Sequence, residues 1–417
     1  MLLKAPEPKT PGPVQVRSPI TGTRSLSQGI LRVGVSGSSS KESAIDAYTR
    51  GLLEGASSAG LPLSFEWLVE RLPNGEGLPP NVHAKKSWTK GPLALFQIWK
   101  AARASRLKVI HLQYEYFLYA ERISAFFIPL SLFLLKLVGG LKTVRVVLTL
   151  HEVVPLSSIG PSLYSRFFIR RVPSVLVKGS MILTNRLLAF SADVLIVHLQ
   201  SFASILSNDY GISPSKISVI PHGVTRRGVP SSPGRDIIFF GFVTPNKGIE
   251  TLVEAFGDIS VPGVKLMLVG GRHRRDDGYF ERIRALASRS PKAGLISLTG
   301  YVGEERLTRL FQDAAVVVLP YKTSFSASGA LAYAMSYEKP VIVPPLDPFK
   351  ESLADSGIYA EADRTQLAPA ITQVLAKREY AEAYSEKIRA RADRMSWSNC
   401  ARMTMDVYLR LLDTPYD

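Results

Sequence analysis

The sequence predicts an α/β protein made of two Rossmann-like, doubly wound domains, and three observations support this class. The chain has 417 residues, which is more than one hydrophobic core usually serves. Short β-branched segments alternate with longer segments of helical period, which is typical of βα units on a parallel sheet. The strand-like segments form two series, one before and one after Pro221. Two series with separate crossovers favour two sheets that face one cleft.

The expected strands define the predicted domain limits. Those of the first series are Leu31–Val35, Val109–Gln113, Val144–Leu150 and Val194–His198, and those of the second are Asp236–Phe240, Val264–Val269, Leu295–Thr299, Val316–Leu319 and Pro340–Val343. The segment His222–Arg235 contains Gly, Pro and Ser and is the expected linker. We therefore predict a flexible basic tail over residues 1–28, domains over 29–223 and 224–395, and a separate amphipathic helix within 396–417.

The formal net charge of +16 favours anionic partners: nucleic acid, an acidic membrane surface or phosphorylated small molecules. The basic residues are scattered, and the sequence has no zinc-finger spacing, no RNP-like aromatic strand and no basic helix with heptads. We therefore expect no nucleic-acid partner. Cys400 is the only cysteine, so no intramolecular disulfide can form and a reduced, cytoplasmic setting is expected.

Two apolar segments bear on membrane contact. The run Ala125–Leu135 is shorter than the roughly 18 residues that a bilayer span needs. We expect a buried core helix there, with an interfacial membrane helix as the alternative. The segment Tyr164–Val177 leaves two interpretations open. Its arginines Arg166, Arg170 and Arg171 would dock a lipid-linked or membrane-bound acceptor, or they form the charged face of a core helix.

The segment Gly241–Gly248, GFVTPNKG, has the composition of a diphosphate-binding loop. Its glycines let the backbone approach a ligand, and the helical run Ile249–Phe256 that follows offers unpaired N–H groups. Lys247 adds a positive charge beside them. An ordinary strand–loop–helix turn with a solvated lysine accounts for this segment equally well.

A resemblance to a known family decides between these interpretations. GFVTPNKGIETLVEAF resembles the first loop and helix of the C-terminal domain in retaining GT-B glycosyltransferases, which include glycogen synthases and many mannosyl- and glucosyltransferases. Further stretches follow in the family's order: VLTLHEVVP at 147–155, VIPHGV at 219–224, LVGG at 268–271, LTGYVGEERLTRL at 298–310, DAAVVVLPY at 313–321 and SASGALAYAMSYEKPVIV at 326–343. The resemblance implies the GT-B fold, with an N-terminal acceptor domain, a C-terminal nucleotide-sugar donor domain, and the helix Ser396–Leu412 crossing back to the N-terminal domain.

The same resemblance implies a donor site. Lys247 matches the lysine that neutralises the donor's phosphates, whereas Phe242 stands at the position of the family's arginine. Arg272, Arg274 or Arg275, or backbone N–H groups, would replace its charge; a solvated basic loop is the alternative role for these arginines. AMSYEKPVI aligned with the family's AMASGKPVI puts Phe325 and Tyr333 at the two positions of the family's paired glutamates. The expected donor-binding residues are Gly241, Lys247, Gly248, Gly300, Tyr301, Val302, Ser326, Ser328, Gly329, Ala330 and Leu331. A helix N-cap by Ser326 or Ser328 is the alternative role for that small-residue turn.

On the N-terminal side, the resemblance places His151 close to the transferred sugar, where a histidine can bond a hydroxyl or assist proton transfer. His151 is therefore the expected catalytic residue. The expected acceptor-side residues are Gly37, Ser38, Tyr114, Glu115 and Glu152. We expect structural roles for His222, in the crossover turn, and for Glu351, which compensates a helix dipole.

The implied reaction is transfer of a hexose-type sugar from a nucleotide sugar to a hydroxyl of a glycan, lipid-linked or small-molecule acceptor, with retention at the anomeric carbon. We expect no metal and no cofactor apart from the nucleotide sugar as co-substrate, because Lys247 and a helix N-terminus would take the charge of the leaving diphosphate. The alternatives are a nucleotide-sugar epimerase and a GT-B binding protein without transferase activity. A cytoplasmic location, with contact at the inner face of an acidic membrane, completes the expectation.

Overall fold

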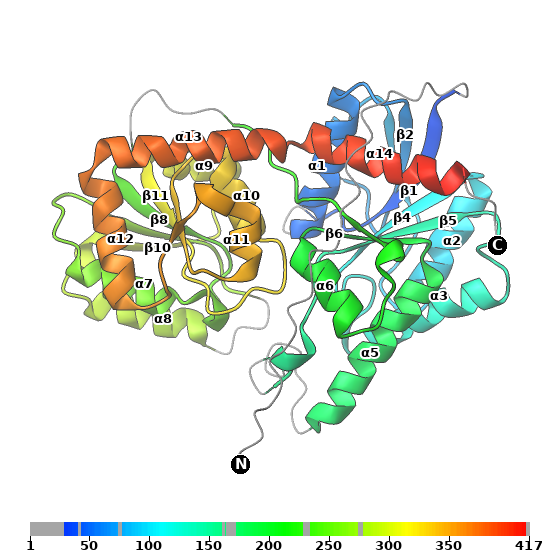
Figure 1. Cartoon of the computed structure of the whole chain (residues 1–417), viewed down its shortest axis with the longest axis horizontal. Coiled ribbons are helices and arrows are strands. Elements are labelled where there is room, and N and C mark those ends of the chain that lie inside the picture. Colours follow the sequence, from blue (N-terminus) through cyan, green and yellow to red (C-terminus); the bar gives the residue numbers. More distant parts are fainter. Residues whose placement is uncertain are drawn as a thin grey trace, which may run out of the picture.

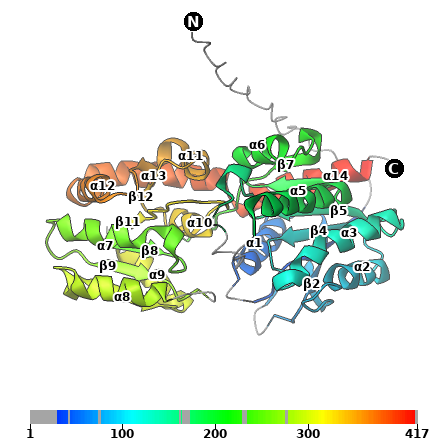
Figure 2. The ribbon, with the colours of Figure 1, turned by 90° about the horizontal axis from the view of Figure 1, so that it is seen from below.

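The computed structural model describes residues 29–40, 43–73, 77–160, 163, 172–227, 234–273 and 278–413. It contains two parallel sheets side by side, each covered by helices (Figure 1). The same two bodies are seen edge-on in Figure 2. The predicted tail over residues 1–28 lies outside the described residues, as do Arg166, Arg170, Arg171, Arg274 and Arg275.

The N-terminal sheet has seven strands in the order β3-β2-β1-β4-β5-β6-β7, and every neighbouring pair is parallel. The strands are β1 (Leu31–Ser36), β2 (Leu63–Val69), β3 (Val82–Lys86), β4 (Val109–Tyr114), β5 (Arg145–Leu150), β6 (Val194–Val197) and β7 (Ile217–Val219). The helices are α1 (Ala44–Ser58), α2 (Ala94–Ala104), α3 (Phe127–Leu137), α5 (Ser174–Ser191) and α6 (Gln200–Asn208).

Alternation of side chains along buried strands builds one core on each face of this sheet. In β5, Val146 and Leu148 belong to the cluster formed with α2, α3, α5 and α6, whereas Val147 belongs to the cluster formed with α1. All six residues of β5 are buried. A strand that is apolar on both faces is typical of a doubly wound sheet, because helices cover both sides.

The C-terminal sheet has six strands in the order β10-β9-β8-β11-β12-β13, again all parallel. The strands are β8 (Asp236–Phe240), β9 (Leu266–Val269), β10 (Ile296–Gly300), β11 (Ala314–Val318), β12 (Val341–Val343) and β13 (Ile358–Tyr359). The helices are α7 (Ile249–Asp258), α8 (Tyr279–Arg289), α9 (Glu304–Asp313), α10 (Gly329–Ser336), α11 (Asp347–Leu353), α12 (Arg364–Ala376) and α13 (Arg378–Arg394).

The nine predicted strands are all present, with ends within two residues of the expected ones. The strands β2, β3, β7 and β13 were not predicted. β3 has the sequence VHAKK, and most of its residues are exposed or half-buried at a sheet edge, so hydrophobicity gives little signal there. β7 and β13 have three and two residues, which is too short for a periodic pattern.

The predicted core helix over Ala125–Leu135 is buried on one face only. The 3₁₀ turn η1 (Arg122–Phe126) leads into α3, and only one side of α3 is buried, through Ile128, Leu132 and Leu135. The opposite side is open to solvent. The run is apolar all round, so sequence period could not show that one face lacks a partner.

The C-terminal helix α14 (Trp397–Asp413) continues from the end of α13 and lies on the N-terminal domain against α1 (Figure 1). Its first residue, Trp397, fills a notch lined by glycines. A Cβ atom added at Gly51, Gly55 or Gly223 would overlap Trp397. Two of these glycines are on α1 and the third is in the crossover between the domains, so the indole ties α14 to both.

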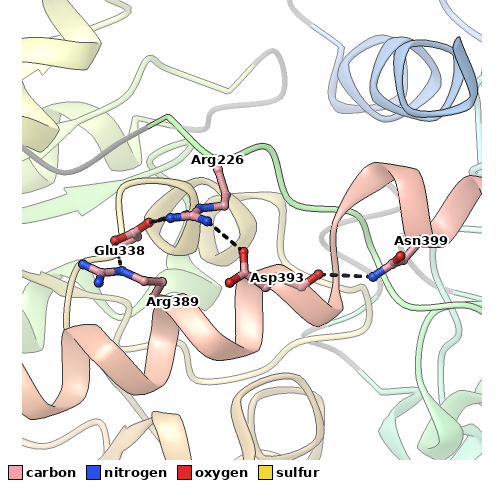
Figure 3. Close-up of polar contacts among 5 residues, drawn as sticks. All are labelled: Arg226, Glu338, Arg389, Asp393 and Asn399. Carbon is pink, nitrogen blue, oxygen red and sulfur yellow. Dashed lines mark hydrogen bonds and ion pairs between the residues drawn. The ribbon is translucent and has the colours of Figure 1, made fainter. Parts of the chain in front are cut away.

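The linker is held by a cluster of charges beside this notch (Figure 3). Arg226 Nη2 lies 2.9 Å from Glu338 Oε1, and Arg389 Nε lies 2.6 Å from Glu338 Oε2. Arg226 also reaches Asp393, at 3.1 Å, whose backbone carbonyl accepts from the Asn399 side chain. The Glu338 side chain has no exposed surface. Its φ of 55° is in the left-handed region, where the family pattern has glycine.

Exchange of Glu338 separates its charge from its backbone strain. Glu338→Gln should lower the free energy of unfolding by about 1 to 2 kcal/mol, because it weakens contacts to two half-exposed guanidinium groups. Glu338→Ala and Glu338→Gly both remove the side chain with all of its contacts, but only the glycine relieves roughly 1 kcal/mol of left-handed strain. In urea unfolding, the glycine variant should therefore be the more stable of the two. A glutamine variant as stable as the parent would contradict this account.

Candidate functional site

The carboxyl ends of the N-terminal strands carry the predicted acceptor-side residues. Gly37 follows β1, and a Cβ there would lie 2.9 Å from Thr49 Oγ1 and 3.3 Å from Gln113 Cγ, so this position needs a glycine. The Ser38 hydroxyl is turned toward Glu70 Oε1, at 3.3 Å, and Ser38 is buried. Tyr114 is also buried, within the core on the α3 side of the sheet. Glu115 is half-buried just after it.

The end of β5 meets the C-terminal domain directly. The Val153 N–H donates to the Phe325 carbonyl at 2.9 Å, and Glu152 forms an antiparallel bridge with Ser326. The structure therefore brings the predicted His151–Glu152 segment to the predicted serine turn. Phe325 itself packs against the core of the N-terminal domain. The side chain at the position of the family's first glutamate is thus an apolar contact between domains.

Three glycines lie together at the carboxyl edge of the C-terminal sheet, at the ends of neighbouring strands β8, β9 and β10. The Gly241 N–H donates to Val269, and the Gly270 N–H donates to the Gly300 carbonyl at 3.2 Å. A Cβ on Gly270 would overlap the Gly241 carbonyl. The predicted residue Tyr301 follows this edge and is 72% exposed, while Val302 is partly buried. Backbone groups therefore dominate this part of the site.

Lys247 and the serine turn converge on a tyrosine that sequence analysis did not single out. The Lys247 Nζ atom lies 3.5 Å from the centroid of the Tyr321 ring, and the Tyr321 hydroxyl lies 3.4 Å from Ser328 Oγ. Gly248 is the N-cap of α7 and has a φ of 65°, and a Cβ there would overlap the Pro320 carbonyl. This geometry sets the ammonium group beside the start of α10.

Ser328 is the N-cap of α10, and its hydroxyl accepts from the Leu331 N–H at 3.3 Å. The helix begins at Gly329, which is exposed, followed by Ala330. First-turn N–H groups have no partner within their own helix, so they can bind an anion. A cap and an anion site can thus coexist at this turn.

The two other departures from the family pattern also have partners. Tyr333 donates to Glu304 Oε1 at 2.6 Å, and the Arg227 guanidinium lies 4.7 Å from the Tyr333 ring centroid and pairs with Glu304. A carboxylate is therefore still present beside position 333, but it comes from the start of α9. Phe242 packs against the His273 ring, and Arg272 pairs with Glu281 on α8.

Glu351 joins the two domains through a helix dipole. Its carboxylate accepts from the backbone N–H groups of Gln200 and Ser201 and from the Ser201 hydroxyl, the last two at 2.9 Å. These N–H groups open α6 of the N-terminal domain, whereas Glu351 is on α11 of the C-terminal domain. The expected dipole compensation is therefore present, but the helix concerned belongs to the other domain.

His151 lies within a buried cluster of aromatic and imidazole rings. The Tyr48 ring centroid is 4.6 Å from that of His151, 5.0 Å from that of His198 and 5.3 Å from that of His222. It is also 5.0 Å from the Trp397 indole. The cluster links the C-terminal helix to the end of β5.

Both nitrogens of His151 have protein partners. Nδ1 is 3.3 Å from His198 Nε2, and Nε2 is 2.9 Å from the Gln113 amide oxygen. The Gln113 amide nitrogen in turn faces His111 Nε2, at 3.3 Å, and His111 Nδ1 is 2.6 Å from the Tyr408 hydroxyl on α14. At the other end, His198 Nδ1 is 3.0 Å from the Ile220 carbonyl.

Hydrogen-bond directions decide which nitrogens carry protons. The Ile220 carbonyl only accepts, so His198 must donate from Nδ1 and, being neutral, accept at Nε2. His151 then donates from Nδ1 and needs a donor at Nε2. Turning the Gln113 amide by half a turn supplies that donor, and its oxygen then joins the Thr149 hydroxyl, 2.6 Å from His111 Nε2, in accepting from His111. All bonds of the relay then run in one direction, from Tyr408 to Ile220.

Burial keeps these imidazoles neutral. It lowers the pKa of His111 and of His198 to about 3, and lowers the pKa of His151 well below its ordinary value. Neighbouring histidines lower these pKa values further. His151 is therefore held as a neutral ring with its proton on Nδ1, and for it to act as a base at Nε2, Gln113 would have to move.

The cluster predicts that stability falls as pH falls. Unfolded histidines take up protons below a pKa of about 6.5, whereas the buried ones stay neutral until a much lower pH, so the unfolded state binds more protons. Each such histidine should cost about 1.4 kcal/mol per pH unit below that value. Urea unfolding between about pH 7 and pH 5 measures the slope.

His198→Gln should make this slope shallower by about one proton, whereas His83→Gln, at a position exposed on β3, should leave it unchanged. A flat dependence of stability on pH in the parent protein would contradict the buried neutral cluster.

Comparison with known proteins identifies the family. A model described as "Glycosyltransferase Family 4" matches residues 59–226, and one described as "Glycosyl transferases group 1" matches residues 234–377. The chain belongs to the family 4 type of glycosyltransferases. The two matches divide at the linker, and the second contains Lys247 and the Ser326–Leu331 turn.

Among curated relatives of this family, a GDP-mannose:glycolipid 4-beta-D-mannosyltransferase of Xanthomonas campestris is 33% identical over 114 residues, 27% of this chain and 30% of that protein. O-antigen chain mannosyltransferase B of Escherichia coli is 28% identical over 177 residues, 41% of this chain and 45% of that protein. The matched parts thus span less than half of each relative's length.

Solved structures establish the GT-B fold over nearly the whole chain. Sucrose-phosphate synthase of Thermosynechococcus elongatus has a TM-score of 0.68 and 19% identity, covering 92% of this chain and 99% of that one. Anabaena HepE in complex with UDP-glucose has a TM-score of 0.65 and 14% identity, covering 91% and 100%. The predicted family and fold are therefore confirmed.

Within this family 4 chain, the residues that sequence analysis missed had a partial signal. Tyr321 ends the quoted stretch DAAVVVLPY, and His198 follows a strand just as His151 does. Gln113 and Tyr408 gave none, because the contact of Gln113 with His151 spans 38 residues and that of Tyr408 with His111 spans 297 residues. Within the described part of the chain, no helix combines the length and hydrophobicity needed to cross a bilayer, and no group of three or more His, Cys, Asp or Glu could hold a metal ion.

Proposed function

We propose that the protein is a retaining hexosyltransferase that moves a sugar from a nucleotide-sugar donor to a hydroxyl group of a glycan or lipid-linked acceptor. One observation carries the proposal. The Lys247 ammonium group and the start of α10 meet at the Tyr321 ring, with Lys247 Nζ 3.5 Å from the ring centroid and Ser328 Oγ 3.4 Å from its hydroxyl. Positive charge beside unpaired N–H groups suits a diphosphate.

In this proposal Lys247 and α10 stabilise the diphosphate as it leaves, and no step is assigned to a metal or a cofactor. The glycines Gly241, Gly248 and Gly300 allow the backbone to approach the nucleotide, and Tyr301 and Val302 border it. Ser326, which bridges to Glu152, sets the donor next to the N-terminal domain. His151 stays the proposed catalytic residue near the transferred sugar, in the tautomer that His198 imposes.

The relatives support the class of substrates. The Xanthomonas relative is named for GDP-mannose and a glycolipid, the Escherichia relative for O-antigen chains, and the Anabaena neighbour was solved with UDP-glucose. We propose a nucleotide sugar and a glycan or lipid-linked acceptor for this chain on that basis, with contact at an acidic membrane surface. We propose no nucleic-acid partner, on the scattered distribution of the basic residues in the sequence alone.

Two other functions predict different products. An epimerase would convert one nucleotide sugar into another without an acceptor, and a binding protein would leave every nucleotide sugar intact. Incubation with a panel of UDP-, GDP- and ADP-sugars, followed by separation of the nucleotide products, distinguishes them. A transferase releases the nucleoside diphosphate, slowly by hydrolysis when no acceptor is present.

Exchange of Lys247 tests the diphosphate assignment. Lys247→Ala should weaken binding of a nucleoside diphosphate by roughly tenfold to a hundredfold, because a charge-assisted hydrogen bond contributes about 1.5 to 3 kcal/mol. Lys322→Ala is the matched control, since Lys322 is a nearby exposed lysine that pairs with Glu250 at 3.8 Å. Calorimetric titration with UDP, GDP and ADP measures both. Equal affinities in the two variants would contradict the assignment, and no binding to the parent protein would contradict the function.

A further inference from the structure

Helices α3 and α5 form an apolar surface that no described residue covers. The exposed side chains on α3 follow one stripe, from Phe126 and Phe127 through Leu130 and Leu134 to Leu137 and Val138. Their exposed fractions run from 37% to 78%. The spacing of three and four residues puts them on one side of the helix, opposite the buried residues Ile128, Leu132 and Leu135.

A second stripe on α5 adjoins the first. Val175, Leu176, Leu183 and Phe190 are 50% to 70% exposed, and Val172 precedes them. Figures 1 and 2 both place α5 beside α3. The ring centroids of Phe133 and Phe190 are 5.3 Å apart, so the two stripes meet. Contiguous exposure of this kind marks a surface that contacts another apolar phase.

The charges within the two helical segments have one sign. The acidic residues that flank them are paired, Glu121 with Lys90 and Asp193 with Arg145. Residues 124–144 and 172–192 contain Lys136, Lys142, Lys178 and Arg186, and neither segment contains Asp or Glu. Two copies of the chain pressed together here would set like charges against each other. Anionic lipid headgroups complement the lysines and arginine while the acyl region accepts the apolar side chains.

The topology connects this surface with the cleft. Helices between parallel strands run antiparallel to them, so α3 and α5 both begin at the carboxyl edge of the N-terminal sheet. His151 follows β5 at that same edge. A bilayer lying on α3 and α5 would therefore border the entrance through which a membrane-held acceptor reaches the cleft.

We propose that the α3–α5 surface binds an anionic lipid bilayer peripherally, with the apolar stripes entering the interface and Lys136, Lys142, Lys178 and Arg186 at the headgroups. The proposal gives a place to the membrane contact named under the proposed function. It is independent of transfer, because lipid binding needs neither donor nor acceptor.

Co-sedimentation with vesicles tests the surface. The full chain should bind vesicles of phosphatidylcholine mixed with phosphatidylglycerol, bind phosphatidylcholine alone much less, and lose binding as salt is raised. The double variant Leu134→Glu with Leu183→Glu should bind mixed vesicles at least roughly tenfold more weakly than the parent, because two charges enter the apolar stripes. The matched control, Ile30→Glu with Leu72→Glu, adds the same charge at exposed apolar positions outside these helices and should bind like the parent.

Thermal stabilisation by a nucleoside diphosphate serves as the check that each variant is folded. Equal vesicle binding by both double variants, or none by the parent, would overturn the lipid proposal and leave the proposed function untouched. Light scattering that shows a dimer in the parent and a monomer only in the Leu134→Glu, Leu183→Glu variant would overturn it in favour of a second copy.

Discussion

The arrangement of the two domains depends on one packing contact, that of the Trp397 indole with the glycines around it. Gly51 on α1 and Gly223 in the crossover leave the space that the indole fills, and Gly55 on α1 leaves space for the Trp397 backbone. A methyl group at any of the three would overlap Trp397. The backbone supports the same junction, since the Val224 N–H donates to the Met395 carbonyl at 2.8 Å. The beginning of α14 is thus packed against both domains at once.

Rings carry this contact toward the cleft. Trp397 packs on Tyr48, and Tyr48 packs on His151, with centroid separations of 5.0 Å and 4.6 Å. Tyr408, further along α14, begins the hydrogen-bond relay that ends at the Ile220 carbonyl in the crossover. The position of His151 therefore depends on a helix that is more than 240 residues away in the sequence, and its tautomer depends on the Ile220 carbonyl in the crossover. Because the rings are closely packed, a displacement of α14 would displace His151 as well.

On the opposite side of the cleft, three departures from the family pattern form contacts of their own, and the first of them crosses between the domains. Phe325 stands where the family has a glutamate, and it packs on the N-terminal core. Tyr333 stands at the second glutamate position, and its hydroxyl donates to Glu304, which brings a carboxylate beside that position. Glu338 stands at a glycine position and binds two arginines. At each of these positions the family's residue is replaced by one that contacts another part of this chain.

Sequence predicted what local pattern determines. The buried strands were found because their β-branched residues are continuous, and the position of Lys247 follows from one strand, one loop and one helix. A cap by Ser326 or Ser328 was the alternative interpretation for the same reason, and the structure has it at Ser328. The exposed side of α3 was not predicted, because an apolar helix has no period that tells its covered face from its open one. The relay through Gln113 and His198 was missed since its members come from separate strands and from α14.

The central claim is that a nucleotide sugar binds at the edge formed by the glycine loops, Lys247 and the start of α10. Hydrogen–deuterium exchange with and without a nucleoside diphosphate tests it most directly, because it reports each backbone N–H group. Exchange should slow in residues 241–248, 300–304 and 326–331 together. Unchanged exchange in all three segments at saturating UDP, GDP and ADP would contradict the claim.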